Sequence, residues 1–144
     1  MNPAPFCLIG IVNVTPDSFS DGGKYIDPCN AVAHGLRLLD EGAGMLDLGA
    51  ESTRPFAEPV PEGEEIARLM PVVARLREQR PDAVLSVDTL KAGTARAALE
   101  GGADIINDVS ACVADPALLD VLAEYKPGYA VSYTHLTLPT KRIV

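Results

Sequence analysis

Short apolar segments alternate along the chain with longer stretches in which apolar residues recur every three or four positions. The apolar segments are residues 7–12, 45–48, 84–87 and 104–106, and a further one begins at Tyr129. Short segments rich in Val, Ile and Leu and bounded by Gly or polar residues are typical of strands buried on both faces. The pattern therefore predicts four strands and the start of a fifth.

The stretches between these segments have the period of amphipathic helices. The first helix is expected to begin at Pro28, with Asp27 as its N-cap, and to end near Gly42. The other helices are expected from the glutamates at 62–65 onward, over residues 91–100, and over residues 116–125.

Pro71 lies inside the second helical stretch. A proline in a helix interior lacks a backbone N–H and costs about 3 kcal/mol. We therefore expect a kink there, or a helix in two pieces.

The elements repeat in the order strand, loop, helix, which implies a parallel sheet with helices outside it, closed as a barrel or open and doubly wound. No GxGxxG follows the first strand, which disfavours a dinucleotide-binding fold. Polar residues stand at the carboxyl ends of the strands, at Asn13, Asp88 and Asn107 and in the loop after Leu48. A TIM (β/α)8 barrel places its active site there, and a complete one needs about 250 residues. The expected fold is a truncated TIM barrel of four βα units and a fifth strand.

Composition narrows the functional classes. The chain has 144 residues and a net charge of −8, which argues against broad contact with nucleic acid or an anionic membrane but allows a local phosphate site. Its three cysteines have no CxxC spacing, so we expect small, buried or partly buried residues of a reducing compartment. No apolar run is long enough to span a membrane, and the first residues do not have the pattern of a signal peptide. A cytoplasmic protein is expected.

Two long polar loops follow the first two strands. The first, over residues 13–23, reads NVTPDSFSDGG and has Phe19 near its tip. Loops of this length in compact domains are usually functional or disordered. An ordinary solvated connector would explain the Ser, Asp, Gly and Pro residues but not an aromatic residue, Phe19, in such a polar loop.

The last part of the chain departs from the pattern. Residues 132–144 read SYTHLTLPTKRIV and have no helical period. We expect two regions, a barrel part over residues 1–131 and an unrelated or poorly ordered tail over 132–144, to which we assign no functional residue.

Four motifs, in this order, resemble those of dihydropteroate synthases, the folate-pathway enzymes that sulfonamides inhibit. They are NVTPDSFSDGG at 13–23, DLGAESTRP at 47–55, SVDT at 86–89 and INDVS at 106–110. The first motif is long and specific, and the resemblance covers about residues 6–131. It implies a TIM barrel that binds small molecules, with a parent protein that could be a homodimer.

The resemblance also implies a reaction. The pyrophosphate ester of 6-hydroxymethyl-7,8-dihydropterin condenses with p-aminobenzoate and releases pyrophosphate, with Mg²⁺ as cofactor. Asn13 resembles the family's asparagine at the metal and pyrophosphate, and Thr53 and Arg54 resemble its residues on the pyrophosphate and aminobenzoate side. A hard cation takes oxygen ligands such as an amide carbonyl, and hydroxyl and guanidinium groups donate to phosphate.

The other implied site residues contact the organic parts of the substrates. Asp88 and Asn107 resemble pterin-binding residues, and Phe19 and Pro55 resemble loop residues that enclose aminobenzoate. A carboxylate can accept from two neighbouring N–H groups of a pterin, while an amide both donates and accepts.

From spacing alone, simpler roles remain open for several of these residues. Asp88 could cap the following helix, Asn107 could be a turn amide, and Arg54 could be a surface cation paired with a nearby glutamate. Asp47 lies within a strand pattern, where a structural hydrogen bond is at least as good an interpretation as a role in catalysis. Asp108 could be a cap or a neighbour of the site.

Two other functions remain open. Pterin-binding domains of corrinoid-dependent methyltransferases are similar around the strand-end Asp and Asn, but a methyl donor needs no pyrophosphate site. The chain could also be a non-catalytic fragment, because the family's later strands supply a Lys, an Arg and a His that are not found here. We therefore expect little or no turnover from this chain alone.

Overall fold

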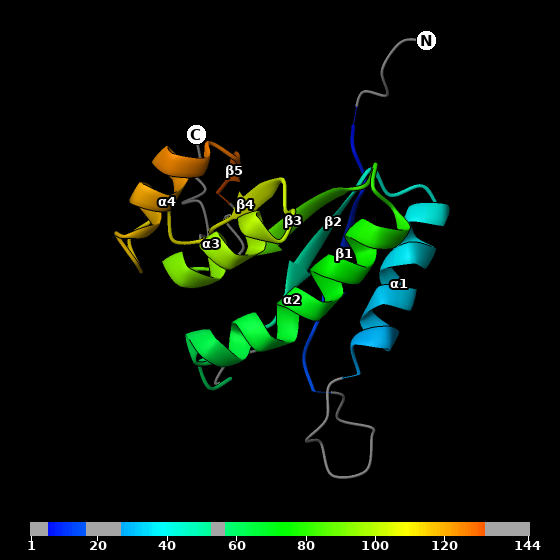
Figure 1. The fold of residues 1–144 in the computed structure, drawn as a ribbon, viewed down its shortest axis with the longest axis horizontal. Helices are drawn as coiled ribbons and strands as arrows, with labels where there is room; N and C mark the ends of the chain where they lie inside the picture. The colour runs from blue at the N-terminus through cyan, green and yellow to red at the C-terminus, as the bar shows by residue number, and fades with distance from the viewer. Residues whose placement is uncertain (1–5, 17–26, 53–56, 132–144) are drawn as a thin grey trace, which may run out of the picture.

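The computed structural model describes residues 6–16, 27–52 and 57–131 (Figure 1). Within these residues, strands and helices alternate from β1 to β5. Their bounds are β1 (Ile9–Asn13), α1 (Pro28–Asp40), β2 (Met45–Gly49), α2 (Glu62–Gln79), β3 (Val84–Asp88), α3 (Ala92–Glu100), β4 (Ile105–Asn107), α4 (Leu118–Tyr125) and β5 (Gly128–Ala130).

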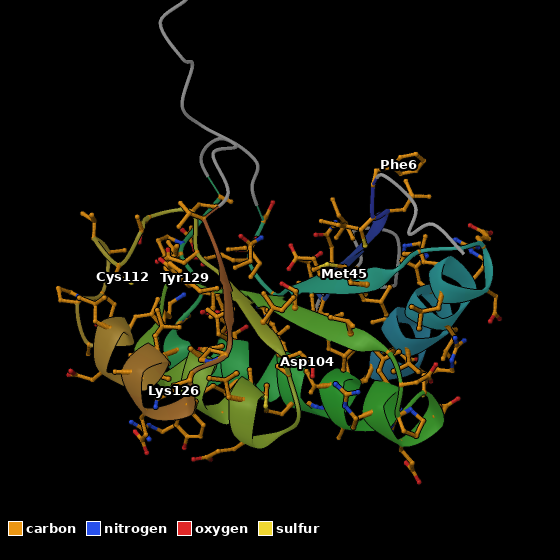
Figure 2. The ribbon with its side chains drawn as sticks, turned by 90° about the horizontal axis from the view of Figure 1, so that it is seen from above. Phe6, Met45, Asp104, Cys112, Lys126 and Tyr129 are labelled. Carbon is orange, nitrogen blue, oxygen red and sulfur yellow. The ribbon has the colours of Figure 1, made fainter. Side chains whose placement is uncertain are left out.

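The strands form one parallel sheet in the order β1-β2-β3-β4-β5. Figure 2 shows the helices together on one side of this sheet. A doubly wound sheet would have helices on both faces and a reversal of strand order. The consecutive order and one-sided helices therefore confirm the expected class, an α/β sheet of the barrel type with fewer strands than a complete barrel.

The core lies between the sheet and the helices. Alternate strand residues face the helices and are fully buried, among them Val12, Leu46, Leu85 and Ile106. They pack against the apolar sides of the helices, which supply Leu69, Val72, Val73, Leu76, Ala95, Ala98 and Leu118. In this layer, side chains from every second residue of the strands contact side chains that recur about every 3.6 residues along the helices.

The opposite face of the sheet carries apolar side chains without a covering layer of described helices. Ile9 and Ile11 on β1 are 55% and 63% exposed, and Val84 on β3 is 37% exposed. Ile9, Met45 and Val84 are register neighbours, so they form one row across this face. In a closed barrel this face is the packed interior.

The first helix begins as its sequence predicts. The Asp27 side chain accepts a hydrogen bond from the Cys29 backbone N–H at 2.9 Å, and Pro28 occupies the first helical position. The helix ends at Asp40, and Gly42 has a φ of +108° that residues with a side chain rarely adopt. Local signals are sufficient here because cap, helix start and stop are neighbours in sequence.

Three expectations about local structure need correction. Helix α2 runs from Glu62 to Gln79 across Pro71, so the two-piece alternative is wrong. Pro71 leaves the carbonyl of Ala67 without its helical partner, and Ala67 is exposed, so water can reach that position. Helix α4 begins at Leu118, two residues later than expected.

The third correction concerns the cysteines. Cys112 is buried, but Cys7 and Cys29 are exposed, so the expectation of burial is wrong for these two. Among the described helices, none is long and apolar enough to cross a membrane.

Candidate functional site at the carboxyl ends of the strands

The polar residues predicted at the strand ends form one row across the sheet. Residues paired in register are Asn13 with Gly49, Gly49 with Asp88, Asp88 with Asn107, and Asn107 with Ala130. Register neighbours in a parallel sheet point to the same face. Asn13, Asp88 and Asn107 are therefore brought together at one edge, on the face opposite the helices.

Each of the three residues is the last residue of its strand, not the first residue of a loop. Asp88 does not cap α3: the backbone N–H of Ala92, the first helical residue, donates to Asp115 Oδ2 at 2.8 Å. Asn107 is paired within the sheet and is not a turn amide. The simpler interpretations left open for Asp88 and Asn107 are therefore excluded by position.

The Asp88 carboxyl lies in an electrostatically unfavourable place. Burial is the largest cause and the negative charge of Asp47 the next, and together with more distant carboxylates they raise the pKa of Asp88 to about 6. No hydrogen bond joins the Asp88 side chain to another described residue. A ligand that donates N–H groups would supply what this carboxylate lacks.

Asp47 lies one layer deeper in the sheet, on the same face as Asn107, and holds the Asn107 side chain in place. The Asn107 Nδ2 donates to Asp47 Oδ2 at 3.0 Å. The remaining oxygens of this pair, Asp47 Oδ1 and Asn107 Oδ1, are both buried and have no hydrogen-bond partner within the described part of the chain. The structural role anticipated for Asp47 is therefore present, and it leaves an acceptor free on Asn107.

Asn13 differs from the other two because its side chain is exposed. It forms no hydrogen bond with another described residue. Among the described residues, no group of three or more His, Cys, Asp or Glu could hold a metal ion. The amide oxygen of Asn13 fits the donor chemistry of a hard cation, but only as one ligand among others that a substrate and water would supply.

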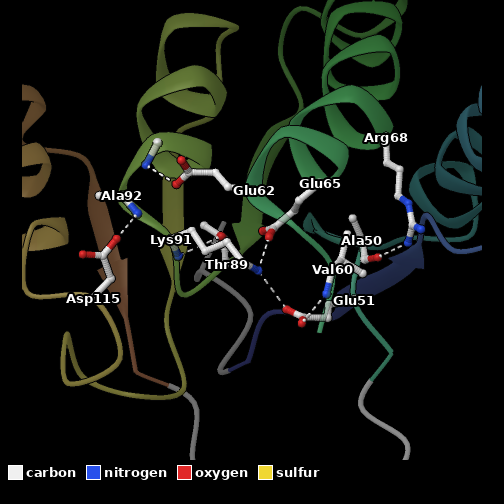
Figure 3. A network of polar contacts seen from close by, with 11 residues as sticks. Ala50, Glu51, Val60, Glu62, Glu65, Arg68, Thr89, Lys91, Ala92 and Asp115 are labelled. Atoms are coloured by element: carbon white, nitrogen blue, oxygen red, sulfur yellow. Dashed lines mark hydrogen bonds and ion pairs between the residues drawn. The ribbon is translucent and has the colours of Figure 1, made fainter. Parts of the chain in front are cut away.

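A network of charged residues joins the loop after β2 to the start of α3 (Figure 3). Lys91 Nζ contacts Glu65 Oε2 at 2.5 Å and Glu51 Oε2 at 3.2 Å. Glu65 is only 1% exposed. Burial alone would lower the pKa of Lys91, but the hydrogen bonds and charges of Glu65 and Glu51 outweigh it and raise that pKa.

The same network holds the two ends of the loop segment 51–60. The Val60 backbone N–H donates to Glu51 Oε1 at 3.0 Å. Glu62 Oε2 accepts from the Gly93 backbone N–H at 2.9 Å. The sequence alone did not predict these contacts of Glu51, Glu62 and Lys91, because they join residues far apart in the chain.

Asp108 organises the loop after β4 and does not face the row of site residues. It is fully buried and accepts from the Ser110 N–H and hydroxyl, the Cys112 N–H and the Tyr129 hydroxyl. Burial would raise the pKa of Asp108, but these hydrogen bonds outweigh it and lower that pKa. They also hold Ala111 and Cys112 at φ values of 53° and 63°, a strained region for residues with a side chain.

Four predicted site residues, Phe19, Thr53, Arg54 and Pro55, lie outside the described residues. Their roles stay predictions. The expected division at residue 131 also stays a prediction, because residues 132–144 are not described either.

The sheet and its polar edge define a class of protein, the βα barrel type, in which ligand sites lie at the carboxyl ends of the strands. The chain matches the family described as "Pterin binding enzyme" over residues 9–142, and it belongs to that family.

The individual relatives agree with the resemblance noted in the sequence. The dihydropteroate synthase of Mycobacterium leprae is 50% identical over 136 residues, which are 94% of this chain and 47% of the relative. A structure of Xanthomonas albilineans dihydropteroate synthase with 4-aminobenzoic acid is 52% identical with a TM-score of 0.78, over 85% of this chain and 45% of that one. The same enzyme with 7,8-dihydropteroate is 48% identical with a TM-score of 0.72, over 85% and 44%. The chain therefore spans about half the length of these relatives.

Proposed function

We propose that this chain supplies the pterin and pyrophosphate side of a dihydropteroate synthase. In this reaction, 6-hydroxymethyl-7,8-dihydropterin pyrophosphate condenses with p-aminobenzoate and releases pyrophosphate. The observation that carries the proposal is the single row of Asn13, Asp88 and Asn107 on one face of the sheet.

The chemistry of the row suits a pterin. A pterin presents adjacent N–H and NH₂ donors on one edge of its ring, and the row presents buried oxygen acceptors. Asp88 is an acceptor without a partner among the described residues, and Asn107 Oδ1 is another. Hydrogen bonds from the ligand to the ionised Asp88 would stabilise its charged form, which the surroundings disfavour.

The pyrophosphate side rests on Asn13 and on the residues of the second loop. Asn13 would contribute its amide oxygen to Mg²⁺, while Thr53 and Arg54 would donate hydrogen bonds to the leaving pyrophosphate. When bound, Mg²⁺ neutralises charge that develops on the pyrophosphate as it leaves. Phe19 and Pro55 would enclose p-aminobenzoate and exclude water, which would otherwise compete with the aniline nitrogen for the electron-poor methylene carbon.

One observation favours a chain that is not active by itself. The apolar residues Ile9 and Ile11 are exposed on the face that carries the proposed site. A site at the edge of such a sheet has walls on one side only, so we expect little or no turnover from the isolated 144-residue chain. Measurable turnover by the purified monomeric chain would contradict that expectation.

A chimera tests the function itself. Residues 9–131 of this chain replace the corresponding segment of the Mycobacterium leprae relative, and pyrophosphate release is measured with the pterin ester and p-aminobenzoate. We expect release that requires both substrates, and no methyl transfer from a methylated folate. A folded chimera that releases no pyrophosphate, beside an active parent enzyme, would overturn the proposal, and methyl transfer would favour the methyltransferase alternative.

A further inference from the structure

We infer that Asp47 is a positioning residue that fixes the orientation of the Asn107 side-chain amide and thereby adds to the preference of the site for a pterin over a heterocycle with the opposite order of donor and acceptor. This inference rests on the proposed function, because it assumes that the row binds a pterin. It assigns to Asp47 a role in specificity, beyond the structural hydrogen bond.

The Asp47–Asn107 hydrogen bond can run in one direction only. A carboxylate only accepts hydrogen bonds, whereas an amide has a donor side and an acceptor side. The two side chains are 3.0 Å apart between Asn107 Nδ2 and Asp47 Oδ2. Rotating the amide by 180° would place Asn107 Oδ1 against Asp47 Oδ2, oxygen to oxygen, in a buried place where such repulsion is strong.

The fixed amide of Asn107 presents one acceptor and one donor to a ligand. Because Nδ2 faces Asp47, Oδ1 is held away from it, and Oδ1 is buried without a partner within the described residues. One Nδ2 hydrogen is engaged by Asp47, and the second remains available. Asn107 therefore presents an acceptor and a donor in one fixed order and cannot adapt to a ligand that needs the opposite order.

A pterin and a lumazine present opposite orders of donor and acceptor. A pterin has an amino group at position 2 beside an unprotonated N1, which is a donor next to an acceptor. A lumazine has an oxo group at position 2 beside an N1–H, which is an acceptor next to a donor. A freely rotating amide could read both edges by turning over, but a fixed amide reads one and leaves the other with unpaired buried groups.

The surroundings of Asp47 indicate that it fixes the orientation of Asn107 and is not a general structural contact. Its register neighbours on the same face are Ile11 and Ser86, and the buried Ser86 hydroxyl has no partner within the described residues. The hydrogen bond from Asn107 is the one that the Asp47 side chain makes with those residues. Asp47 thus orients one residue of the proposed site and no part of the described loops.

The first experiment needs no ligand. Side-chain amide signals of Asn107 are observed by NMR in the 144-residue chain, with Asn107→Ser used for assignment. In the wild type we expect one Nδ2 proton that exchanges slowly with water and is shifted by its bond to Asp47. Asp47→Ala should abolish this protection, Asp47→Asn should retain part of it, and Ser86→Ala, the matched control, should leave it unchanged.

The second experiment measures discrimination. Affinities of 6-hydroxymethylpterin and 6-hydroxymethyllumazine are compared by calorimetry in the same variants. The wild type and Ser86→Ala should prefer the pterin, and Asp47→Ala should reduce that preference at least tenfold, mainly by gaining affinity for the lumazine. Asp47→Asn should restore part of the preference. A role in stability alone would weaken both ligands equally.

The outcomes separate the inference from the proposed function. If Asp47→Ala loses the NMR protection but keeps the preference for the pterin, the role in specificity is wrong. If Asp47→Ala keeps the protection, Asp47 does not fix the orientation of Asn107. If the protection behaves as expected but neither the 144-residue chain nor the chimera binds the pterin, the proposed function fails, and the assigned discrimination fails with it.

Discussion

At the scale of single residues, Asp88 is the group whose surroundings differ most from those of an ordinary surface aspartate. Its pKa of about 6 follows first from burial and then from the neighbouring Asp47. Residues at functional sites often have such shifts, because a site that receives a ligand leaves its polar groups without internal partners. Here the raised pKa of Asp88 and its position in the row both indicate that it binds a ligand.

The first prediction concerns pH. Donor groups of a pterin bind the ionised form of Asp88, so affinity for 6-hydroxymethylpterin should fall about tenfold per pH unit below pH 6. Asp88→Asn should bind more weakly at pH 7.5 and should lose this pH dependence. Calorimetric titrations between pH 5 and pH 8 measure both effects, and Ser86→Ala serves as the control that keeps the wild-type profile.

The same pKa has a consequence for stability that needs no ligand. The pKa of Asp88 in the folded chain is above the ordinary value of 3.8, so the folded state holds its proton more tightly than the unfolded state. The free energy of unfolding should therefore decrease as pH rises from about 4 to 6, by at most about 3 kcal/mol. Urea unfolding of wild type and Asp88→Asn should show this decrease only in the wild type. Identical pH profiles would contradict the assignment.

At the scale of elements, the Lys91 network connects three parts of the chain. Glu51 belongs to the loop after β2, Glu65 to α2, and Lys91 to the start of α3. Glu65 is the most deeply buried member, with 1% exposure, so its charge depends on Lys91 for compensation. The network fixes the base of the loop that carries the predicted residues Thr53 and Arg54.

The second prediction separates burial of charge from the net contribution of the pair. Lys91→Met leaves Glu65 buried without its partner and should lower the free energy of unfolding by about 3–5 kcal/mol. The double variant Lys91→Met/Glu65→Leu should recover most of that loss, because no unpaired charge remains. Glu51→Gln, at a side chain that is 32% exposed, should cost less than about 1 kcal/mol.

Urea unfolding at pH 7 measures all three variants. A double variant as unstable as Lys91→Met would show that the ion pair itself, and not the unpaired carboxylate, carries the stability.

The elements also show which contacts the sequence could predict and which it could not. The Asp27 cap joins residues two positions apart, so a local pattern predicts it. The three site residues at strand ends were predicted because parallel strands bring their carboxyl ends to one edge. The Asp47–Asn107 and Lys91–Glu65 contacts join residues 60 and 26 positions apart, and no local period encodes which of several carboxylates is chosen. Helix α2 continues across Pro71 because its packing on the sheet overrides a local penalty, whereas the expected kink stays a prediction.

At the scale of the whole molecule, the two faces of the sheet are unequal. One face is covered by four described helices, while the other exposes Ile9 and Ile11 on β1 and Val84 on β3. Exposed apolar rows of this kind usually mark a surface that another structural layer covers. The proposed site lies on the same uncovered face, so what covers the apolar rows also forms the far wall of the site.

The third prediction follows from that face. Ile11 is 63% exposed, so Ile11→Thr removes apolar surface without opening a cavity in the described core. In the isolated chain it should reduce both binding of a hydrophobic dye and concentration-dependent association, with a change in unfolding free energy below about 1 kcal/mol. Leu119→Thr is the matched control, because Leu119 is 58% exposed but lies on α4, away from the face.

In the chimera, where the barrel interior is complete, Ile11→Thr should instead destabilise by about 1–3 kcal/mol, because the side chain is then buried. Equal effects of Ile11→Thr and Leu119→Thr in both settings would show that this face is not a barrel interior.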